Sequence, residues 1–325
     1  MTDGPRVGIL ATGDRWHVQA LSAALKRLGF EAIPLPAARL SGRVDPYRSA
    51  GGCPTGGGPR SVRAGDVDLE SLAALLVRYI PPGSLDQIVF RVDALHAIHD
   101  AGLPLVNSPR AIERTVDKFW TSRLLHEAGV PTPRTVAVES FDDALEAFCE
   151  MGDVLVKPLL GSGGRGIVRV TDEDLAYRVF RALDMQRSVF YIQEFVPHGR
   201  SDLRFLVAGG RVVAAARRAG DGWKTNVAAG AEMRLHRPAP EEEELSVRAA
   251  RAVGADYAGV DILESDRGGR LVVEVNGIPG WRALQGTTSV DVASEVAHLV
   301  RERIAARRAE ARPVRCARRR AAAPG

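Results

Sequence analysis

The chain has 325 residues, of which 45% are apolar and 26% are charged, and its formal net charge is +4. These fractions are typical of a soluble globular protein, and the apolar stretches are far shorter than the ~20 residues that a membrane-spanning helix needs. The cysteines Cys53, Cys149 and Cys316 are odd in number and widely spaced, which argues against a disulfide framework or a zinc site. The N-terminus has no basic segment followed by an apolar one, so we expect no signal peptide and a cytoplasmic location.

The positive charge is concentrated at the C-terminus. Residues 301–325 contain nine Arg and two Glu, so this segment carries +7 and the other 300 residues together carry −3. Two interpretations stay open: a solvated helix end followed by disorder, or a surface that contacts nucleic acid, a ribosome or an acidic partner. We expect a basic, disordered tail over 301–325.

The first 107 residues have the pattern of an α/β domain. Strand-like and helix-like segments alternate: strands at 6–11, 30–35, 72–77 and 104–107, and helices at 16–28 and 85–100. This alternation is typical of half of a doubly wound fold. Glycine and proline interrupt it at 41–66, where we expect a loop or insertion.

From residue 108 onwards, strands and helices are mixed without that regular alternation. A single helix is predicted over 110–128, and a second run of strands begins at Val189. We therefore expect α+β organisation, with a small domain at 108–188 and a larger one at 189–300.

Residues 161–166 read Gly-Ser-Gly-Gly-Arg-Gly and match GxGxxG. A dinucleotide-binding loop would open into a helix, whereas an apolar strand follows here. The segment therefore predicts a hairpin flap whose backbone N–H groups close over phosphate oxygens, with Lys157 supplying positive charge. The alternative is a plain glycine-rich hairpin beside a solvated lysine.

Asp261 and Glu274 each lie between β-branched residues of strand-like segments. If Arg267-Gly268 forms a two-residue turn, the register places Asp261 opposite Glu274, and the period of two places Asn276 on the same face. Two carboxylates and an amide oxygen buried together should bind a cation, and all-oxygen ligands suit Mg²⁺. The alternatives are charges on the solvent face of the sheet, or a bulge that shifts the register by one.

A third polar group consists of Asp202, Arg204, Arg217 and Asn226. Asp202 and Arg204 share a strand face by spacing, Arg217 ends the next predicted strand, and Asn226 follows in a polar loop. Surface charge is the alternative that spacing alone leaves open.

Taken in order, these motifs resemble the ATP-grasp superfamily, and within it the RimK-type α-L-glutamate ligases. The resemblance covers residues 108 to about 298 well and the N-terminal domain more loosely. It implies an ATP-grasp fold, α/β and α+β, preceded by a Rossmann-like pre-ATP-grasp domain at 1–107. The landmarks are Asn107-Ser108-Pro109, Asp117-Lys118, Val156-Lys157-Pro158, Gly161–Gly166, Gln193–Val196, Ser201–Arg204, Asn226, Gly259–Asp261, Glu274–Asn276 and Pro279-Gly280.

The resemblance also implies roles for individual residues. The nucleotide would contact Lys118, Lys157, Gly161, Ser162, Gly163, Gly164, Gln193, Glu194, Phe195, Val196 and Asp202. The transferred phosphate and the acyl-phosphate would face Arg204, Arg217 and Asn226. Two Mg²⁺ ions, with Mn²⁺ as an alternative, would be bound by Asp261, Glu274 and Asn276.

The implied reaction is ATP-dependent addition of L-glutamate to an acceptor carboxylate through an acyl-phosphate, with release of ADP and phosphate. Two loops near the acceptor depart from many relatives, because no basic residue follows Asn226 and the segment after Asn276 reads Gly-Ile-Pro-Gly-Trp-Arg. Trp223 and Trp281 lie beside these loops, so we expect a planar, pterin-type acceptor of the tetrahydromethanopterin kind, unless both indoles are core residues. A homo-oligomer is also expected.

Three alternatives remain open at this point. In the first, the acceptor is a ribosomal protein C-terminus or another polypeptide. In the second, the chain is a catalytically silent nucleotide-binding regulator. In the third, it binds RNA or the ribosome through its arginine-rich end.

Overall fold

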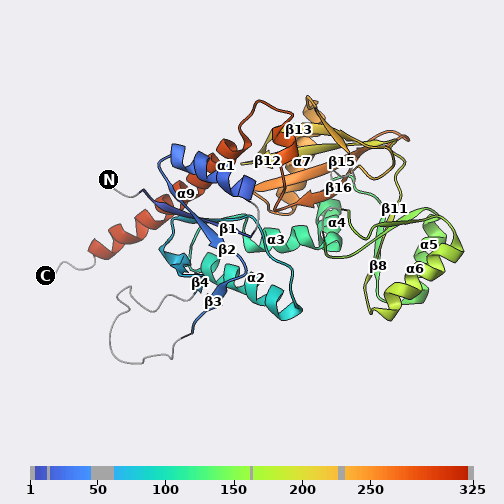
Figure 1. Cartoon of the computed structure of the whole chain (residues 1–325), viewed down its shortest axis with the longest axis horizontal. Helices are drawn as coiled ribbons and strands as arrows, with labels where there is room; N and C mark the ends of the chain where they lie inside the picture. The colour runs from blue at the N-terminus through green and yellow to red at the C-terminus, as the bar shows by residue number, and fades with distance from the viewer. Residues whose placement is uncertain (1–3, 13–14, 45–61, 162–163, 226–230, 321–325) are drawn as a thin grey trace. The chain divides into compact units, whose positions relative to one another are not determined.

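The computed structural model describes residues 4–12, 15–44, 62–161, 164–225 and 231–320. The chain divides into two compact units (Figure 1). Unit 1 combines the residues up to 110 with those from 291 onwards, and unit 2 comprises residues 111–290. Among the described residues, none of the helices combines the length and the apolar character required to cross a membrane.

Unit 1 is built on a parallel sheet with the strand order β2-β1-β6-β7. Helix α1 connects β1 to β2 and helix α2 connects β6 to β7, so the two crossovers run in opposite directions from the centre of the sheet. Because such crossovers are right-handed, α1 and α2 lie on opposite faces. The bounds are β1 Arg6–Ala11, α1 Arg15–Arg27, β2 Glu31–Pro36, β6 Ala74–Val77, α2 Leu85–Asp100 and β7 Leu105–Val106.

Residues 41–66, predicted as a loop or insertion, include strands at both ends. A small antiparallel sheet consists of β3 Leu40–Gly42, β4 Val62–Ala64 and β5 Val67–Asp68, followed by the short helix η1 Leu69–Ser71. The ends of the predicted loop are therefore strands, and residues 45–61 lie outside the described part.

The arginine-rich C-terminus was expected to be disordered, and the structure differs. Helix α9 runs from Val292 to Arg320 and packs on α1 and β6 (Figure 1). Its first turns bury Val296, Val300 and Ile304, and Arg27 of α1 donates to Asp291 at 2.5 Å. The chain thus returns to unit 1 at residue 291, and the predicted boundary at 300 falls inside a helix.

Unit 2 begins with two helices where the apolar pattern predicted one. Helix α3 covers Pro109–Val116 and α4 covers Lys118–Glu127. Asp117 has an extended backbone and caps α4 by accepting from the Trp120 N–H at 3.0 Å. It also forms a β-bridge with Leu160. The break places Lys118 in the first turn of α4, next to the strand of the glycine-rich segment.

The small subdomain contains a four-stranded sheet with the order β10-β9-β11-β8. Its helices pack on one face of the sheet (Figure 1), and the core there includes Phe148, Phe180 and Phe190. Strand β11 belongs to this sheet, so the subdomain extends beyond the predicted boundary at 188. The bounds are β8 Thr135–Val138, α5 Phe141–Met151, β9 Val154–Lys157, β10 Val168–Val170, α6 Glu173–Met185 and β11 Phe190–Glu194.

The large subdomain contains a five-stranded antiparallel sheet with the order β14-β13-β12-β15-β16. One face packs against α4 and α7, with Leu203, Phe205 and Val260 in the core. Since side chains alternate along a strand, their neighbours Asp202, Arg204 and Asp261 lie on the opposite face. The bounds are β12 Ser201–Ala208, β13 Arg211–Ala219, β14 Glu232–Leu235, α7 Pro240–Ala252, β15 Tyr257–Glu264, β16 Arg270–Asn276 and α8 Arg282–Gln285.

Candidate active site

The hairpin of β15 and β16 places Asp261 opposite Glu274, as the sequence predicts, but by a different route. The turn spans 265–269 rather than two residues, with the Ser265 N–H bonded to the Gly269 carbonyl at 3.0 Å. Near the turn, Ile262 pairs with Val272, and the register shifts between Asp261 and Ile262. The bulge therefore compensates for the different turn and restores the predicted pair.

Val273 is the extra residue of this bulge. Val272 and Val275 both reach the core, although they are three positions apart rather than two. Val273 and Glu274, between them, both line the two cavities described below. A bulge is a common way of redirecting a side chain next to a functional site. Asn276 lies opposite Gly259 at the end of β16.

Asp261 lies at the centre of a buried charge network on the large sheet. Arg204 Nη1 donates to Asp261 Oδ1 at 2.6 Å, and Arg218 Nη2 lies 3.0 Å from Asp261 Oδ2. Arg218 also makes two bonds to Asp202, at 2.6 and 2.5 Å, and Thr225 donates to the same carboxylate at 2.7 Å. All five side chains are buried, so each charge depends on its partners for compensation.

The protonation states in this network follow from the contacts. Burial alone would raise the pKa of Asp261, but Arg204 and Arg218 outweigh it and hold that pKa below its usual range. Burial opposes the charge of Arg218, yet Asp261 and Asp202 raise its pKa. Burial raises the pKa of Asp202 against the opposing effect of Arg218, so the charged forms are favoured at Asp261 and Arg218 but not at Asp202.

The arginine that joins this network is Arg218 and not Arg217. A regular hairpin closed by Gly209-Gly210 would place Arg217 opposite Asp202, but a bulge between Leu206 and Val207 shifts the register by one. Arg217 consequently lies on the other face of the sheet, where it donates to Ser201 at 3.1 Å and to Glu264 at 2.5 Å. Arg217 therefore does not share a face with Arg204, which contradicts the expectation that both face the transferred phosphate.

Gly259 leaves the space that the Arg204 guanidinium occupies. A Cβ atom at position 259 would lie 2.4 Å from Arg204 Nη2. Only glycine allows this close approach, which explains why a glycine interrupts an otherwise apolar strand two residues before Asp261.

Two lysines approach the site from other elements. Lys118 Nζ donates to the carbonyl oxygens of Pro158 and Gly161 at 2.8 and 2.9 Å. Lys157 Nζ donates to Gln193 Oε1 at 2.5 Å. Burial lowers the pKa of both ammonium groups, against the opposing effect of Glu274, and that of Lys157 falls to about 8.

Glu274 lies on the same cavity wall as these lysines. Burial and the neighbouring charge of Asp261 raise its pKa, although Arg204, Lys157 and Lys118 act in the other direction. A buried carboxylate with a raised pKa is incompletely compensated, so a bound cation would lower the cost of its charge. In the described ranges, no cluster of three or more His, Cys, Asp or Glu is placed to hold a metal. The expected ligand set adds an amide, that of Asn276, to two carboxylates.

Gln193 links Lys157 to the interior of the small subdomain. Its amide nitrogen donates to Thr135 at 3.0 Å and to Tyr191 at 3.2 Å, and the Tyr191 hydroxyl is 2.8 Å from Ser122. These bonds orient the amide so that its oxygen faces the lysine. The segment after Gln193 leads from the small sheet to the large one.

These groups line two cavities that share several residues. One, of about 90 Å³, extends from the Glu194–Val196 segment to the charge network, and the other, of about 30 Å³, lies under the glycine-rich segment. Lys157, Ile167, Val273 and Glu274 line both. The described candidate residues on these walls are Lys118, Lys157, Gly161, Gly164, Gln193, Glu194, Phe195, Val196, Asp202, Asp261 and Glu274.

The remaining expectations have different outcomes. Ser162, Gly163 and Asn226 lie outside the described residues. Trp281 is buried in the core with 1% exposure, so the expected stacking of its indole on an acceptor ring is wrong. Trp223 lines the larger of the two cavities, together with His198, Lys224 and Thr225, which the motif analysis did not select.

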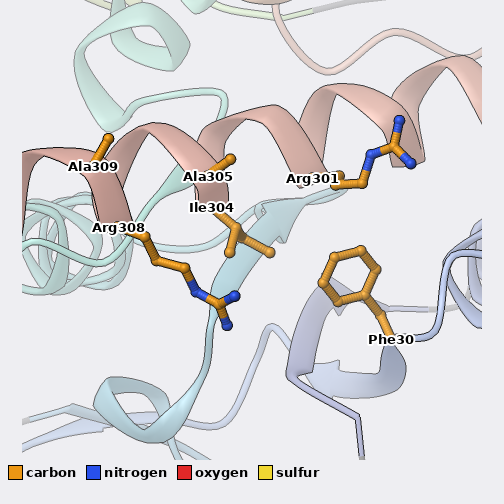
Figure 2. A pocket seen from close by; sticks show the side chains of 6 residues that line it. All are labelled: Phe30, Arg301, Ile304, Ala305, Arg308 and Ala309. Atoms are coloured by element: carbon orange, nitrogen blue, oxygen red, sulfur yellow. The ribbon is translucent and has the colours of Figure 1, made fainter.

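A separate cavity of about 400 Å³ lies in unit 1 (Figure 2). Ile304 and Arg308 extend from α9 into the space that faces Phe30. Its lining residues are Phe30, Arg301, Ile304, Ala305, Arg308 and Ala309. Every described candidate residue belongs to unit 2, so this cavity is distinct from the site.

Comparison with known proteins identifies the type of domain. A family model described as a RimK-like ATP-grasp domain matches residues 115–300. The chain is similar to the tetrahydromethanopterin:alpha-L-glutamate ligase of Methanosarcina acetivorans, with 31% identity over 310 residues that cover 86% of this chain and 93% of that protein. A protein of the same name from Methanocaldococcus jannaschii is 36% identical over 214 residues, covering 64% of this chain and 73% of the relative.

Solved structures support the same fold. The RimK domain ATP-grasp protein of Sphaerobacter thermophilus matches with a TM-score of 0.70 and 24% identity, covering 90% of this chain and 98% of that chain. The ATP-grasp ligase PsnB, complexed with precursor peptide PsnA2 and AMPPNP, also gives a TM-score of 0.70, with 20% identity and coverage of 94% and 99%. At these identities the likeness concerns the fold alone, and the predicted fold class is confirmed.

The lowered pKa of Lys157 gives a direct prediction. Its ε-amino group should titrate near pH 8 in the folded, nucleotide-free protein and near 10.5 in the urea-unfolded chain, because burial disfavours the ammonium form. The folded state then binds fewer protons than the unfolded state between these two values, so this lysine makes the free energy of unfolding increase with pH in that window. Competitive acetylation across pH, followed by peptide mass spectrometry, measures the value. Titration near 10.5 in the folded protein would contradict it.

Proposed function

The chain belongs to the RimK-like ATP-grasp family, and from that premise we propose that it uses ATP and Mg²⁺ to join L-glutamate to the carboxylate of a pterin-type cofactor. ATP-dependent formation of a C–N bond is the chemistry of this family. The observation that carries the proposal is the convergence of Lys118, Lys157 and Glu274 on one cavity, beside a second cavity that reaches the segment Gln193–Val196, here called the hinge segment. The acceptor is supported by relatives named tetrahydromethanopterin:alpha-L-glutamate ligase at 31–36% identity.

In the proposed complex, the nucleotide occupies the two connected cavities. Lys118 and Lys157 exchange their carbonyl and amide partners for phosphate oxygens, which accept stronger, charge-assisted bonds. The hinge segment Gln193–Val196 receives the base, with Glu194 accepting from its amino group. The glycine-rich segment covers the phosphates and keeps water away from a hydrolysable intermediate.

We assign the metal to the hard oxygen donors of Asp261, Glu274 and Asn276, with two Mg²⁺ ions as the expected number and Mn²⁺ as an alternative. The raised pKa of Glu274 and the oxygen donors of all three side chains support this assignment. When bound, the metal supplies positive charge to the phosphates. Since Asp261 is engaged by two guanidinium groups, it would offer a metal the lone pairs that these two contacts leave free.

Arg204 and Arg218 are the proposed stabilisers of charge on the transferred phosphate, in place of the pair Arg204 and Arg217. They lie on the site face, whereas Arg217 pairs with Glu264 on the other. Asp202 accepts three bonds from Arg218 and Thr225, so we propose that it positions Arg218. The acceptor carboxylate would then attack the γ-phosphate, and the amine of glutamate would displace phosphate from the resulting acyl-phosphate.

A polypeptide acceptor is the second candidate. Structural neighbours are complexed with precursor peptides, but at about 20% identity they support the fold and not the acceptor. The arginine-rich α9 is the observation that favours a ribosomal or other acidic partner. The identity to relatives named tetrahydromethanopterin:alpha-L-glutamate ligase over most of the chain is the stronger support, so we commit to the pterin.

Matched substitutions of Arg218 and Arg217 test which of the two arginines stabilises charge on the transferred phosphate. Arg218→Lys keeps the charge but loses the planar fork that bridges Asp202 and Asp261, and we expect kcat to fall by about 100-fold. The matched Arg217→Lys should stay within about twofold, because its ion pair is half-exposed on the opposite face. ADP release measures both. Equal losses, or a greater loss in the Arg217 variant, would contradict the assignment.

Glu274→Gln tests the metal site with little change in volume. Turnover should fall at least about 100-fold, and more Mg²⁺ should be needed for half-maximal rate, because a charged ligand is lost. Glu264→Gln is the control, since this carboxylate lies on the same hairpin but pairs with Arg217. Near-wild-type ADP production by the Glu274 variant would refute the metal assignment.

The acceptor is tested by offering the purified protein ATP, Mg²⁺ and glutamate with either of two substrates. One is a tetrahydropterin bearing a side-chain carboxylate, and the other is a ribosomal-protein C-terminal peptide. Mass spectrometry should detect a glutamyl adduct of the pterin alone. Modification of the peptide alone would establish the polypeptide alternative, and absence of ADP release with both would contradict an active ligase for either acceptor.

A further inference from the structure

We infer that Arg169 is a positioning residue. It holds the Phe195 ring in the wall of the larger cavity, which is proposed to receive the base, and thereby determines the affinity for ATP. Arg169 lies on β10, the strand that follows the glycine-rich segment, and it is outside the motifs that carry the family resemblance. The inference rests on the proposed nucleotide site. Arg169 would affect the nucleotide only through the Phe195 side chain.

Three contacts join Arg169, Asp153 and Phe195. The Arg169 guanidinium makes two bonds to the Asp153 carboxylate, Nε to Oδ1 at 2.9 Å and Nη2 to Oδ2 at 2.6 Å. The same guanidinium carbon lies 3.5 Å from the centroid of the Phe195 ring. The two-point bond fixes the plane of the guanidinium, so it presents a flat surface to the ring.

Asp153 holds Phe195 a second time through the main chain. Its carbonyl oxygen accepts from the Phe195 N–H at 2.9 Å. One residue therefore fixes both the backbone of the hinge and the cation that covers its aromatic side chain. The Phe195 ring could rotate without breaking the backbone bond to Asp153, but not without losing its contact with the Arg169 guanidinium. The contact with Arg169 therefore fixes the orientation of the ring.

The Phe195 ring in turn forms part of the larger cavity wall. Its neighbours on the pocket side are Trp223, with ring centroids 6.0 Å apart and planes at 87°, and His198 at 5.9 Å. His198 bonds to the carbonyl oxygens of Val196 and Trp223 at 2.7 and 3.1 Å. Arg169 does not line the cavity in the described residues, so its influence on a bound base passes through Phe195.

The chain offers a matched control in the same subdomain. Arg181 on α6 lies 4.0 Å from the centroid of the Phe141 ring and 3.1 Å from Asp184. This cluster repeats the Asp–Arg–Phe chemistry but belongs to neither cavity. Replacing Arg169 and replacing Arg181 therefore each remove an ion pair and a cation–π contact, but only the Arg169 cluster touches the hinge segment.

The experiment compares Arg169→Ala with Arg181→Ala in the full-length protein at saturating Mg²⁺, glutamate and carboxylated tetrahydropterin, since turnover needs an acceptor carboxylate. In Arg169→Ala the KM for ATP should rise about 5- to 10-fold while kcat stays within about twofold, because ground-state positioning of the base is lost and the phosphate site is intact. The Kd for ADP, measured by calorimetry, should rise by the same factor. Arg181→Ala should change neither constant.

Two further variants protect the test against misfolding. Arg169→Lys keeps the strand and the charge but loses the two-point bond, and it should show a smaller increase in KM than Arg169→Ala. Asp153→Asn keeps the backbone bond to Phe195 and should raise the KM for ATP in the same direction, with no further increase when combined with Arg169→Ala. An unchanged KM in Arg169→Ala, or an equal increase in Arg181→Ala, would overturn the inference. Absence of nucleotide binding by the wild-type protein would instead overturn the proposed function on which it rests.

Discussion

The burial of Asp261 is the constraint on which the site depends. A carboxylate in the interior of a sheet is tolerated only when charges of opposite sign meet it at hydrogen-bonding distance. Arg204 and Arg218 do so from two neighbouring strands, and Asp202 balances the second of them. Three strands must therefore keep one register, because a slip by one residue would leave several charges unpaired at once.

This requirement explains features that look unrelated along the chain. The guanidinium of Arg204 needs the space left by Gly259. The bulge in β13 is needed to bring Arg218 rather than its neighbour to the site face, and the bulge in β16 keeps Glu274 opposite Asp261 despite the longer turn. The irregularities of the large sheet are thus consequences of satisfying buried charge on one face while packing an apolar core on the other.

The small subdomain contributes a complementary set of groups. Lys157 and Gln193 lie on paired strands, and Lys118 reaches the same cavity because the chain breaks its helix at Asp117. Each of the two lysines has a neutral partner, a carbonyl or an amide oxygen. Such partners satisfy a lysine without neutralising it, so the positive charge stays available to phosphate oxygens. The large sheet holds Arg204, Arg218, Asp202 and Asp261 in ion pairs, whereas the small subdomain leaves its lysines available.

Besides the pairing of Asp261 with Glu274, which it predicted but which forms only through a bulge, the sequence by itself determined the fold class, the alternating pattern of unit 1 and the motifs around Lys157 and Gln193. Each of these depends on local periodicity or on motifs read along the chain. Only the tertiary structure decided that Arg218 replaces Arg217, that Trp281 is buried, that α9 returns to unit 1 and that Asp117 divides a helix. A single extra residue in a strand reverses which side chains face the site. Whether such a bulge forms depends on the packing and charge balance of strands far apart in the sequence, and no local pattern contains that information.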